Sequence, residues 1–452
     1  MPSLLTRRSV LASLAAPRRP NLLLLLPDQW RPDWMPGHPE IPLPLPNLEK
    51  LLARGVKFSR AITPSPLCAP ARACLASGLA YQHCGVVNNA DNYPLAQTTY
   101  YHRLRDAGYH VMGCGKLDLH KKTQDWGLDG RRLVREWGFS DAIDNAGKGD
   151  AVNSGALVPK DPYMKFLHDQ GQADAHVKDM KGRKGYVGTY PTPLPDQLYC
   201  DNFITRNALT LLNAAPANQP WHLAVNFTGP HSPVDITARM EKTVRHRAYP
   251  QPNRNTQYEA PHHLAIRQNY SAMCENIDRG IGEILAAVDQ RGELDNTIII
   301  FSSDHGEMLG DHNRWGKHVP YQASIGIPMV AAGPGVKARG VSNALVSLHD
   351  LTATFLDYAD VKKPSAMDSR SLRPLLAGRT KVHRSHVVSA LEGWRLVWDG
   401  RHKLIEGFEK QSQLFDLQAD PLENANLWHQ QATIRTNLKT LLPAGIIHNP
   451  VN

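Results

Sequence analysis

Residues 21–29 read NLLLLLPDQ, and residues 297–306 read TIIIFSSDHG. Each stretch begins with an unbroken apolar run and ends in polar residues that include a carboxylate. An apolar run without alternation is typical of a strand with both faces buried, as at the centre of a parallel sheet. We therefore expect Asn21–Leu26 and Thr297–Ser302 to be neighbouring central strands of one sheet.

Strands and helices alternate outward from these two runs. Further strands are expected at His110–Gly113, Trp221–Phe227 and Pro328–Ala332. Helices are expected at Pro46–Arg54 with Gly55 as its C-cap, Thr98–Ala107, Gln197–Ala215 and Ile266–Arg291. This order predicts an α/β fold, with a large, mostly parallel central sheet sandwiched by helices.

Two regions depart from this alternation. Residues 140–196 are rich in Gly, Lys, Asp and Pro, with one helical piece near Tyr163–Asp169, and loops of this length are usually functional. We expect an insertion near the site, within a catalytic unit spanning 20–378.

The C-terminal residues 379–452 predict a small α+β subdomain. Strands at Trp394–Trp398 and His402–Ile405 flank the turn Asp399–Arg401, a hairpin signal. Ser412–Leu417 adds a strand and Ala432–Leu442 a final helix.

Composition narrows the class of protein. The chain has 452 residues, 42% of them hydrophobic and 21% charged, which excludes a disordered, collagenous or coiled-coil protein. Its net charge of +9 suits an anionic substrate, but the charges are dispersed and no nucleic-acid motif is present. No apolar run approaches the roughly 18–20 residues of a membrane-spanning helix. Six cysteines are too few for a disulfide scaffold.

Residues 1–19 carry a candidate targeting signal. Arg7 and Arg8 precede a short apolar stretch that ends in small residues, which resembles a twin-arginine export signal. This pattern predicts a periplasmic or secreted protein. The alternative is a basic, frayed N-terminus on a cytoplasmic protein.

Polar groups follow both central strands at the same edge of the predicted sheet, where ligands of parallel sheets bind. Asp28 and Gln29 follow the first strand, and Asp304 and His305 follow the second. Two carboxylates, an amide and an imidazole favour a hard divalent cation such as Ca²⁺ or Mg²⁺. The alternative is that each Asp caps the turn that follows it.

The segment 65–78 reads SPLCAPARACLASG and places Cys68 at a predicted helix start. A helix N-terminus is a natural anion site, and Arg72 lies one turn further along the same face. The spacing Cys-x3-Arg excludes the Cys-x5-Arg loop of phosphatases.

Cys-x-Pro-x-Arg followed by Ala-x-Leu-x-Ser-Gly resembles the signature of the formylglycine-dependent (type I) sulfatases, in the alkaline-phosphatase-like superfamily. The resemblance covers nearly the whole chain. It extends to Asn21–Gln29, Gly115–His120, Gly229–Pro233, Asn276–Lys317 and the segment LFDLQADPLENANL at 414–427.

The resemblance implies hydrolysis of a sulfate monoester, with a sulfated carbohydrate as the expected substrate. Cys68 would be oxidised to 3-oxoalanine (formylglycine) by a maturation enzyme, and its hydrate would be the nucleophile. Asp28, Gln29, Asp304 and His305, together with residue 68, would hold Ca²⁺, with Mg²⁺ or Mn²⁺ as alternatives. Arg72 would contact the hydrate, Lys116 and Lys317 would grip the sulfate, and His231 would face the leaving oxygen.

Two positions depart from the family pattern. Many relatives have two consecutive Asp where this chain has Asp28-Gln29; the amide remains an oxygen donor with one less negative charge. Many also place a His two residues after the Lys, where this chain has Asp118. If Lys116, Asp118 and His120 alternate onto one side, either His120 is the base or Asp118 binds substrate. His318 and Asn89 are further candidates for contact with substrate.

Two other functions stay open at this point. The Asp28-Gln29 form also occurs in the branch that hydrolyses phosphonate monoesters and phosphodiesters, which is the main alternative. A non-catalytic anion-binding relative would lack at least one site group, whereas this chain keeps them all.

Overall fold

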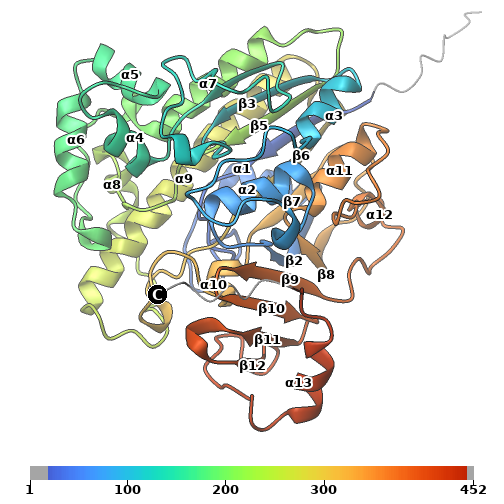
Figure 1. Ribbon diagram of the computed structural model, residues 1–452. Coiled ribbons are helices and arrows are strands. Elements are labelled where there is room, and N and C mark those ends of the chain that lie inside the picture. Colours follow the sequence, from blue (N-terminus) through green and yellow to red (C-terminus); the bar gives the residue numbers. More distant parts are fainter. Residues whose placement is uncertain (1–18, 445–452) are drawn as a thin grey trace, which may run out of the picture.

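The computed structural model describes residues 19–444 (Figure 1). The twin-arginine-like segment with Arg7 and Arg8 lies outside these residues. Within the described range, no helix is both long enough and apolar enough to cross a membrane.

The centre of the molecule is an eight-stranded sheet of order β4-β3-β5-β1-β6-β7-β2-β8. Its strands are β1 (Asn21–Leu25), β2 (Gly55–Ile62), β3 (His110–Gly115), β4 (Asp141–Asp144), β5 (Trp221–Asn226), β6 (Thr297–Ser302), β7 (Met329–Ala332) and β8 (Gly340–Ser347). Only β7 runs antiparallel to its neighbours in this sheet. The predicted α/β fold with a mostly parallel sheet is confirmed.

The two apolar runs are adjacent. β1 pairs with β6 in parallel, with Leu25 opposite Phe301 at their carboxyl ends. The predicted neighbourhood of these strands is therefore confirmed, and the polar residues that follow each strand meet at one edge.

Successive side chains of the central strands enter two different cores. Leu22 and Leu24 pack in one hydrophobic cluster, and Leu23 and Leu25 pack in the other. Because side chains of a strand point alternately to the two faces, both faces of the sheet are covered. This burial explains why the runs show no polar alternation.

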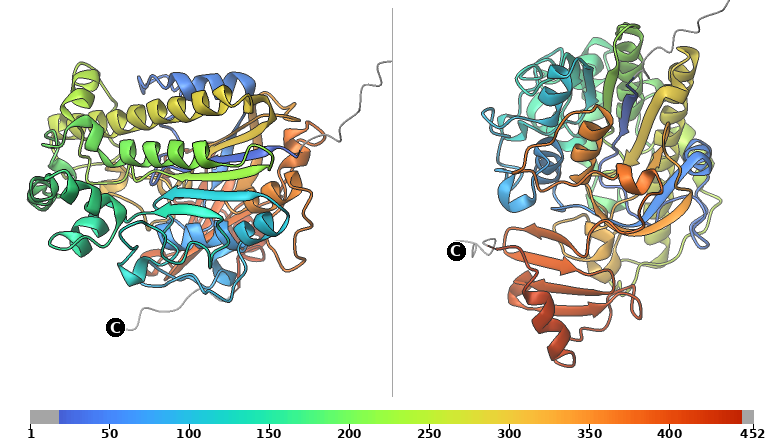
Figure 2. Two further views of the ribbon diagram at one scale, coloured as in Figure 1. Left: turned by 90° about the horizontal axis from the view of Figure 1, so that it is seen from above. Right: turned by 90° about the vertical axis from the view of Figure 1, so that its right-hand side faces the viewer.

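A helix layer covers each face, as the left view of Figure 2 shows. One layer contains α1 (Pro46–Arg54), α7 (Cys200–Ala214) and the long α9 (Ala260–Gln290). The other contains α2 (Cys68–Ser77), α3 (Tyr100–Asp106) and α11 (Asp350–Tyr358). The short helices α8 (Ala238–Val244), α10 (Gln322–Ile325) and α12 (Arg373–Leu376) complete the main body.

Gly55 follows α1 as expected, but its role differs from a left-handed cap. Its φ of −140° is extended, and β2 begins at this residue. A Cβ here would collide with the carbonyl oxygen of Ala331 on β7. Glycine is therefore required by the close approach of two strands.

The segment 140–196 is more ordered than its composition predicted. It contributes the edge strand β4 and three helices, α4 (Lys148–Gly155), α5 (Pro162–Asp169) and α6 (Ala173–Gly182). Only α5 was expected. The other two carry glycines and charges in place of a clear apolar stripe, and they are held by packing on one another and on α5.

The C-terminal region forms a second, antiparallel sheet of order β12-β11-β10-β9 (Figure 1). Its strands are β9 (Val387–Leu391), β10 (Trp394–Trp398), β11 (His402–Glu406) and β12 (Gln413–Asp416). Helix α13 (Ala432–Lys439) packs on it through Leu438. The Ala390 amide donates to the Pro64 carbonyl at 3.0 Å, which joins this sheet to the loop before α2.

Candidate active site

The loops that follow β1 and β6 are tied together. The amide of Gln29 donates to Oδ1 of Asp304 at 3.0 Å, and the amide of Trp30 donates to Oγ of Ser303 at 2.9 Å. Gln29 has a left-handed φ of +65°, which turns the chain sharply after the strand. These bonds bring Asp28 beside Asp304, and both side chains are fully buried.

Helix α2 delivers Cys68 to the same place. Its Sγ lies 3.8 Å from Oδ1 of Asp28 and 3.3 Å from Nε2 of His305. The Ala69 amide, one of the unpaired donors of the first helical turn, is satisfied by Oδ1 of Asn89 at 3.0 Å. Asn89 therefore contributes to the start of this helix as well as to the pocket wall.

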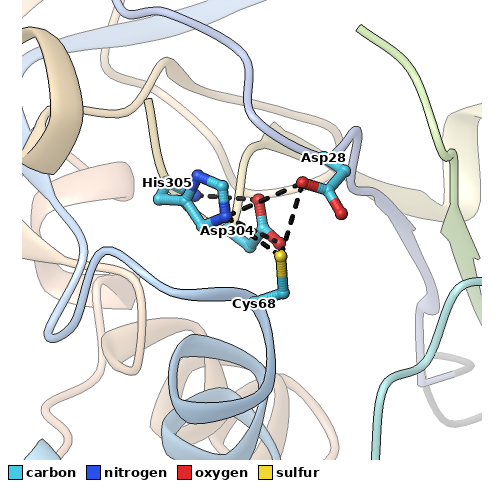
Figure 3. A group of neighbouring side chains, drawn as sticks. All are labelled: Asp28, Cys68, Asp304 and His305. Atoms are coloured by element: carbon cyan, nitrogen blue, oxygen red, sulfur yellow. Dashed lines mark hydrogen bonds and ion pairs between the residues drawn. The ribbon is translucent and has the colours of Figure 1, made fainter. Parts of the chain in front are cut away.

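Four of the predicted metal ligands form one group (Figure 3). The ligand atoms of Asp28, Cys68, Asp304 and His305 all lie within 4.8 Å of one another. Nδ1 of His305 faces the carbonyl of Gly306 at 3.0 Å. That contact makes Nδ1 the donor and leaves the Nε2 lone pair free for a cation, as expected of a metal-binding histidine. The donor set fits a divalent cation.

Gln29, the fifth predicted ligand, lies at the edge of this group. Its amide oxygen accepts a hydrogen bond from Nζ of Lys317 at 2.7 Å, and its nitrogen donates to Glu307. Lys317 Nζ also lies 3.1 Å from Sγ of Cys68.

Cationic side chains dominate the electrostatics around Cys68. Burial raises the pKa of its thiol, but the charges of Lys116 and Lys317 outweigh burial and hold the pKa well below the ordinary value. For Asp28, burial likewise raises the pKa, and the two lysines reverse the effect and lower it. The site is therefore arranged to stabilise negative charge at residue 68.

Arg72 contacts the two carboxylates of the group. Its Nε donates to Oδ2 of Asp304 at 3.0 Å and its Nη1 donates to Oδ1 of Asn226 at 2.9 Å. Its Nη2 is 3.6 Å from Oδ2 of Asp28. Arg72 thus braces the two buried carboxylates and is not among the residues that line the pocket.

The alternation expected after Lys116 ends early. β3 stops at Gly115, and Asp118 adopts a left-handed φ of +53°. Asp118 consequently lies 3.2 Å from both Lys116 and Lys121. Lys116, at the strand end, also pairs with Asp28.

His120 is not brought to the pocket. Its Nε2 lies 3.1 Å from Oδ2 of the buried Asp144, and its ring is in edge contact with Trp126 and Trp137. The predicted placement of Lys116, Asp118 and His120 on one side is wrong, because the backbone leaves the extended conformation. Lys121, which the sequence did not single out, lines the pocket instead.

His231 and His318 face the pocket from two other loops. Burial and the nearby Lys317 lower the pKa of His231. The same two causes lower the pKa of His318 to about 4. The lowered pKa values favour the neutral form of both imidazoles near pH 7.

The pocket above Cys68 has a volume of about 380 Å³. Four lysines line it, namely Lys116, Lys121, Lys148 and Lys317. It shares Asn89 and His318 with a larger cavity of about 970 Å³ that reaches Trp394 and Phe408 of the C-terminal sheet region. An anionic group thus fits at the bottom, with room for a larger group beside it.

Other pocket residues were not singled out individually, although their segments were expected near the site. Tyr186 belongs to the 140–196 segment, and Trp315 precedes Lys317. Glu307 lies beneath the pocket, three residues after Asp304, and its acidic character beside a strand end was the one available clue.

Two protein-family models match this chain. A family model described as Sulfatase matches residues 20–361. A second, described as N-sulphoglucosamine sulphohydrolase, C-terminal, matches residues 310–444.

Individual relatives are distant but match along most of their length. An arylsulfatase of Clostridium perfringens (strain 13 / Type A) is 25% identical over 444 residues, covering 90% of each chain. A choline-sulfatase of Rhizobium meliloti (strain 1021) is 28% identical, covering 90% of this chain and 82% of that protein.

Solved structures share the fold. The phosphonate monoester hydrolase of Agrobacterium radiobacter superposes with a TM-score of 0.79 at 22% identity, covering 94% of both chains. A protein solved in complex with its substrate D-glucosamine-2-N,6-O-disulfate superposes with a TM-score of 0.75 at 18% identity, covering 94% of this chain and 97% of that protein. At these identities the structures support the fold alone.

Proposed function

The chain belongs to the sulfatase family and is a hydrolase of sulfuric ester bonds, and from that premise we propose that Cys68, oxidised to formylglycine, carries its nucleophile. The observation that carries the proposal is the surroundings of Sγ, which lies 3.1 Å from Lys317 and 3.3 Å from His305 at the start of α2. A hydrated formylglycine supplies two hydroxyls, one to attack sulfur and one whose deprotonation releases sulfate. Cysteine and serine lack that second hydroxyl.

We infer that Asp28, Gln29, Asp304 and His305 hold Ca²⁺ together with residue 68. The fit rests on the oxygen-rich donor set and on the free Nε2 of His305. Bound there, the ion would act as a Lewis acid on the sulfate oxygens.

The lysines account for binding of the sulfate group. Lys116 follows β3 and Lys317 follows β6, and both line the pocket and act electrostatically on Cys68. Their charges oppose the negative charge that develops on the sulfate oxygens in the transition state. Removal of one such preorganised contact typically costs about 10²–10³ in rate.

His231 is the proposed acid for the leaving oxygen. Its pKa is lowered by burial and by Lys317. A bound sulfate ester places a negative charge beside the imidazole and favours its protonated form. The ring can then donate a proton to the departing alcohol.

A sulfated carbohydrate is the proposed substrate. The cavity beside the pocket has about 970 Å³, enough for a sugar unit, and combines Trp394 and Phe408 with the polar Asn88 and Glu392. Initial rates on sulfated monosaccharides and on choline sulfate test this choice. A preference for choline sulfate would indicate that the alcohol part of the substrate is cationic and not a sugar.

A phosphodiester or phosphonate monoester is the second candidate substrate. The observation in its favour is Gln29, which leaves the cation group with one less carboxylate than the two-Asp pattern. Sulfate monoesters and phosphodiesters both carry a single negative charge, so the lysines suit either. Relative kcat/KM on a chromogenic sulfate and a chromogenic phosphate diester separates the two.

The maturation step is tested by mass. Coexpression with a formylglycine-generating enzyme should lower the mass of the Cys68 peptide by about 18 Da, as CH₂SH becomes CHO. Activity should rise in proportion to the converted fraction. The matched control is Cys74→Ala, which alters a buried cysteine of the same helix and leaves the conversion intact. Equal turnover by fully unconverted and fully converted protein would exclude formylglycine as the nucleophile.

A further inference from the structure

The side-chain amide of Gln29 is held at both ends by charged groups. Its oxygen accepts from Nζ of Lys317 at 2.7 Å, and its nitrogen donates to Oε2 of Glu307. An amide has one accepting end and one donating end, so the two partners are not interchangeable. The direction of this amide is therefore imposed by its neighbours.

Glu307 is fully buried and bound at every acceptor position. Its Oε2 accepts from Gln29 and from the hydroxyl of Tyr186 at 2.8 Å. Its Oε1 accepts from the amides of Leu309 at 2.8 Å and Gly316 at 2.7 Å. Backbone amides can only donate, so the Leu309 and Gly316 amides leave no proton on Oε1, and the Tyr186 hydroxyl on Oε2 favours the carboxylate form whichever way the Gln29 amide points.

A carboxylate can receive only the NH₂ end of an amide. With Glu307 on one side, the oxygen of Gln29 must face Lys317 and the cation group. If the amide turned over, its nitrogen would meet Lys317, and its oxygen would meet Glu307. Both new contacts would be unfavourable, since they place donor against donor and acceptor against acceptor.

Glu307 also holds the segment that carries Lys317. The Gly316 amide precedes this lysine, and Tyr186 reaches the same carboxylate from the 140–196 segment. A continuous series of hydrogen bonds thus joins Tyr186, Glu307, Gln29, Lys317 and the Sγ of Cys68.

We propose that Glu307 is a positioning residue that points the amide oxygen of Gln29 at Lys317 and the cation site and holds Lys317 against residue 68. It acts through these neighbours and does not line the pocket. The kinetic part of the test rests on the proposed formylglycine chemistry and the Ca²⁺ part on the proposed cation site, whereas the coupling of the two residues read from Tm values rests on neither.

The test is a donor–acceptor exchange in the full chain. Glu307→Gln puts amide against amide, and Gln29→Glu puts two buried carboxylates against each other. Each single variant should lose about 10–100-fold in kcat/KM, as outer partners of metal sites typically do. The double variant Q29E/E307Q restores one donor facing one acceptor, with an oxygen still toward Lys317. The kcat/KM of the double variant should be about tenfold or more above that of Q29E. The effects of the two substitutions would then not add.

Two further measurements keep the test decisive. The rise in Tm on adding Ca²⁺ to metal-free protein should shrink in E307Q and return in the double variant. Tyr186→Phe removes one donor and should give a smaller loss in a well-folded protein, so it serves if E307Q fails to fold. The matched control is Glu293→Gln, which removes a hydrogen-bonded glutamate before β6, at the opposite end of the strand. It should keep kcat/KM and the Ca²⁺ shift.

Three results would overturn the proposal. They are additive effects of the two substitutions, a wild-type Ca²⁺ shift and kcat/KM in folded E307Q, and an unchanged kcat/KM in folded Y186F. A wild-type protein that binds Ca²⁺ yet hydrolyses no sulfate ester would instead count against the proposed function. The coupling between Gln29 and Glu307 would then still be read from the Ca²⁺ shifts and Tm values.

Discussion

The Nζ of Lys317 lies 3.1 Å from the Sγ of Cys68, although 249 positions separate the two residues in the chain. Cys68 begins α2 in one helix layer, and Lys317 follows β6 on a long loop. In the sheet order β6-β7-β2, β7 runs antiparallel to both neighbours, so the carboxyl ends of β2 and β6 lie at the same edge, and the segments beyond them complete the contact. The proposed catalytic centre is thus a product of strand order.

Lys121→Ala should weaken substrate binding. Lys121 lies between Asp118 at 3.2 Å and Asp150 at 2.8 Å and adds positive charge to the pocket. We expect kcat/KM to fall about tenfold, which corresponds to about 1.4 kcal/mol, mainly through a higher KM. Lys122→Ala, which changes the exposed neighbour, is the control. Equal kinetics for the two variants would show that Lys121 does not contact the substrate.

His231→Asn and His120→Asn should behave in opposite ways. His231 lines the pocket, so its loss should lower kcat by about 10²–10⁴, the usual contribution of a general acid. His120 is buried against Asp144 and two tryptophans, so its loss should lower the Tm and leave kcat within about threefold. Steady-state kinetics and thermal unfolding of both variants check this. A large loss of kcat in folded H120N would contradict this prediction and support His120 as the catalytic base.

Removal of the metal should abolish turnover and lower the Tm. Asp28 and Asp304 are fully buried carboxylates, and a cation between them offsets their repulsion. Exhaustive chelation followed by dialysis, with metal content measured, should give inactive protein that added Ca²⁺ restores. Asp304→Asn should bind Ca²⁺ less tightly in calorimetry, with Asp311→Asn as a control on the same loop. Full activity at a verified metal content of zero would refute the role of the cation.

His222 should make the fold less stable in acid. Its imidazole is fully buried on β5, with Nε2 3.0 Å from the Tyr100 hydroxyl and Nδ1 3.0 Å from the Leu22 carbonyl oxygen. Burial lowers its pKa from 6.5 to about 3. Between these values the unfolded chain binds more protons, so the free energy of unfolding falls as the pH falls.

Denaturant unfolding at several pH values measures this effect. Above pH 6.5 the neutral, buried His222 makes its full contribution to the free energy of unfolding. By pH 4 this free energy should have fallen by about 3 kcal/mol. His222→Gln, which cannot titrate, should be less stable than wild type at pH 7, with the difference shrinking toward pH 4. The exposed His429→Gln should follow the wild-type curve. A difference that stays constant from pH 7 to pH 4 would contradict the prediction.

The sheet was predictable because its signal is local. An apolar run such as Thr297–Ser302 must be buried on both faces wherever it lies in the chain. Helices between such runs favour parallel strands, which restricts the possible sheet topologies. Strands β2, β4 and β8 and helices α4 and α6 were missed, because their own residues carry no unbroken apolar run or clear apolar stripe. They are ordered by contacts with one another and with the sheet.

Part of the candidate site was predictable for the same reason. Asp28 and Asp304 follow directly on central strands, and Cys68 lies at a helix start within a distinctive motif. His120 and Lys121 were not distinguishable, since their placement depends on the left-handed backbone at Asp118. Neighbours in sequence can thus point to opposite sides once the strand has ended.

The sequence alone therefore determined the fold class, the central strands β1 and β6 and the polar groups that follow them, because each follows from burial or from position at the end of an element. The tertiary structure alone decided which loop lysine enters the pocket, that Arg72 contacts both buried carboxylates, and that Glu307 faces the amide of Gln29. These relationships join residues far apart in the chain through backbone turns and buried hydrogen bonds. Their geometry is specified by the packed molecule as a whole and by no local run of residues.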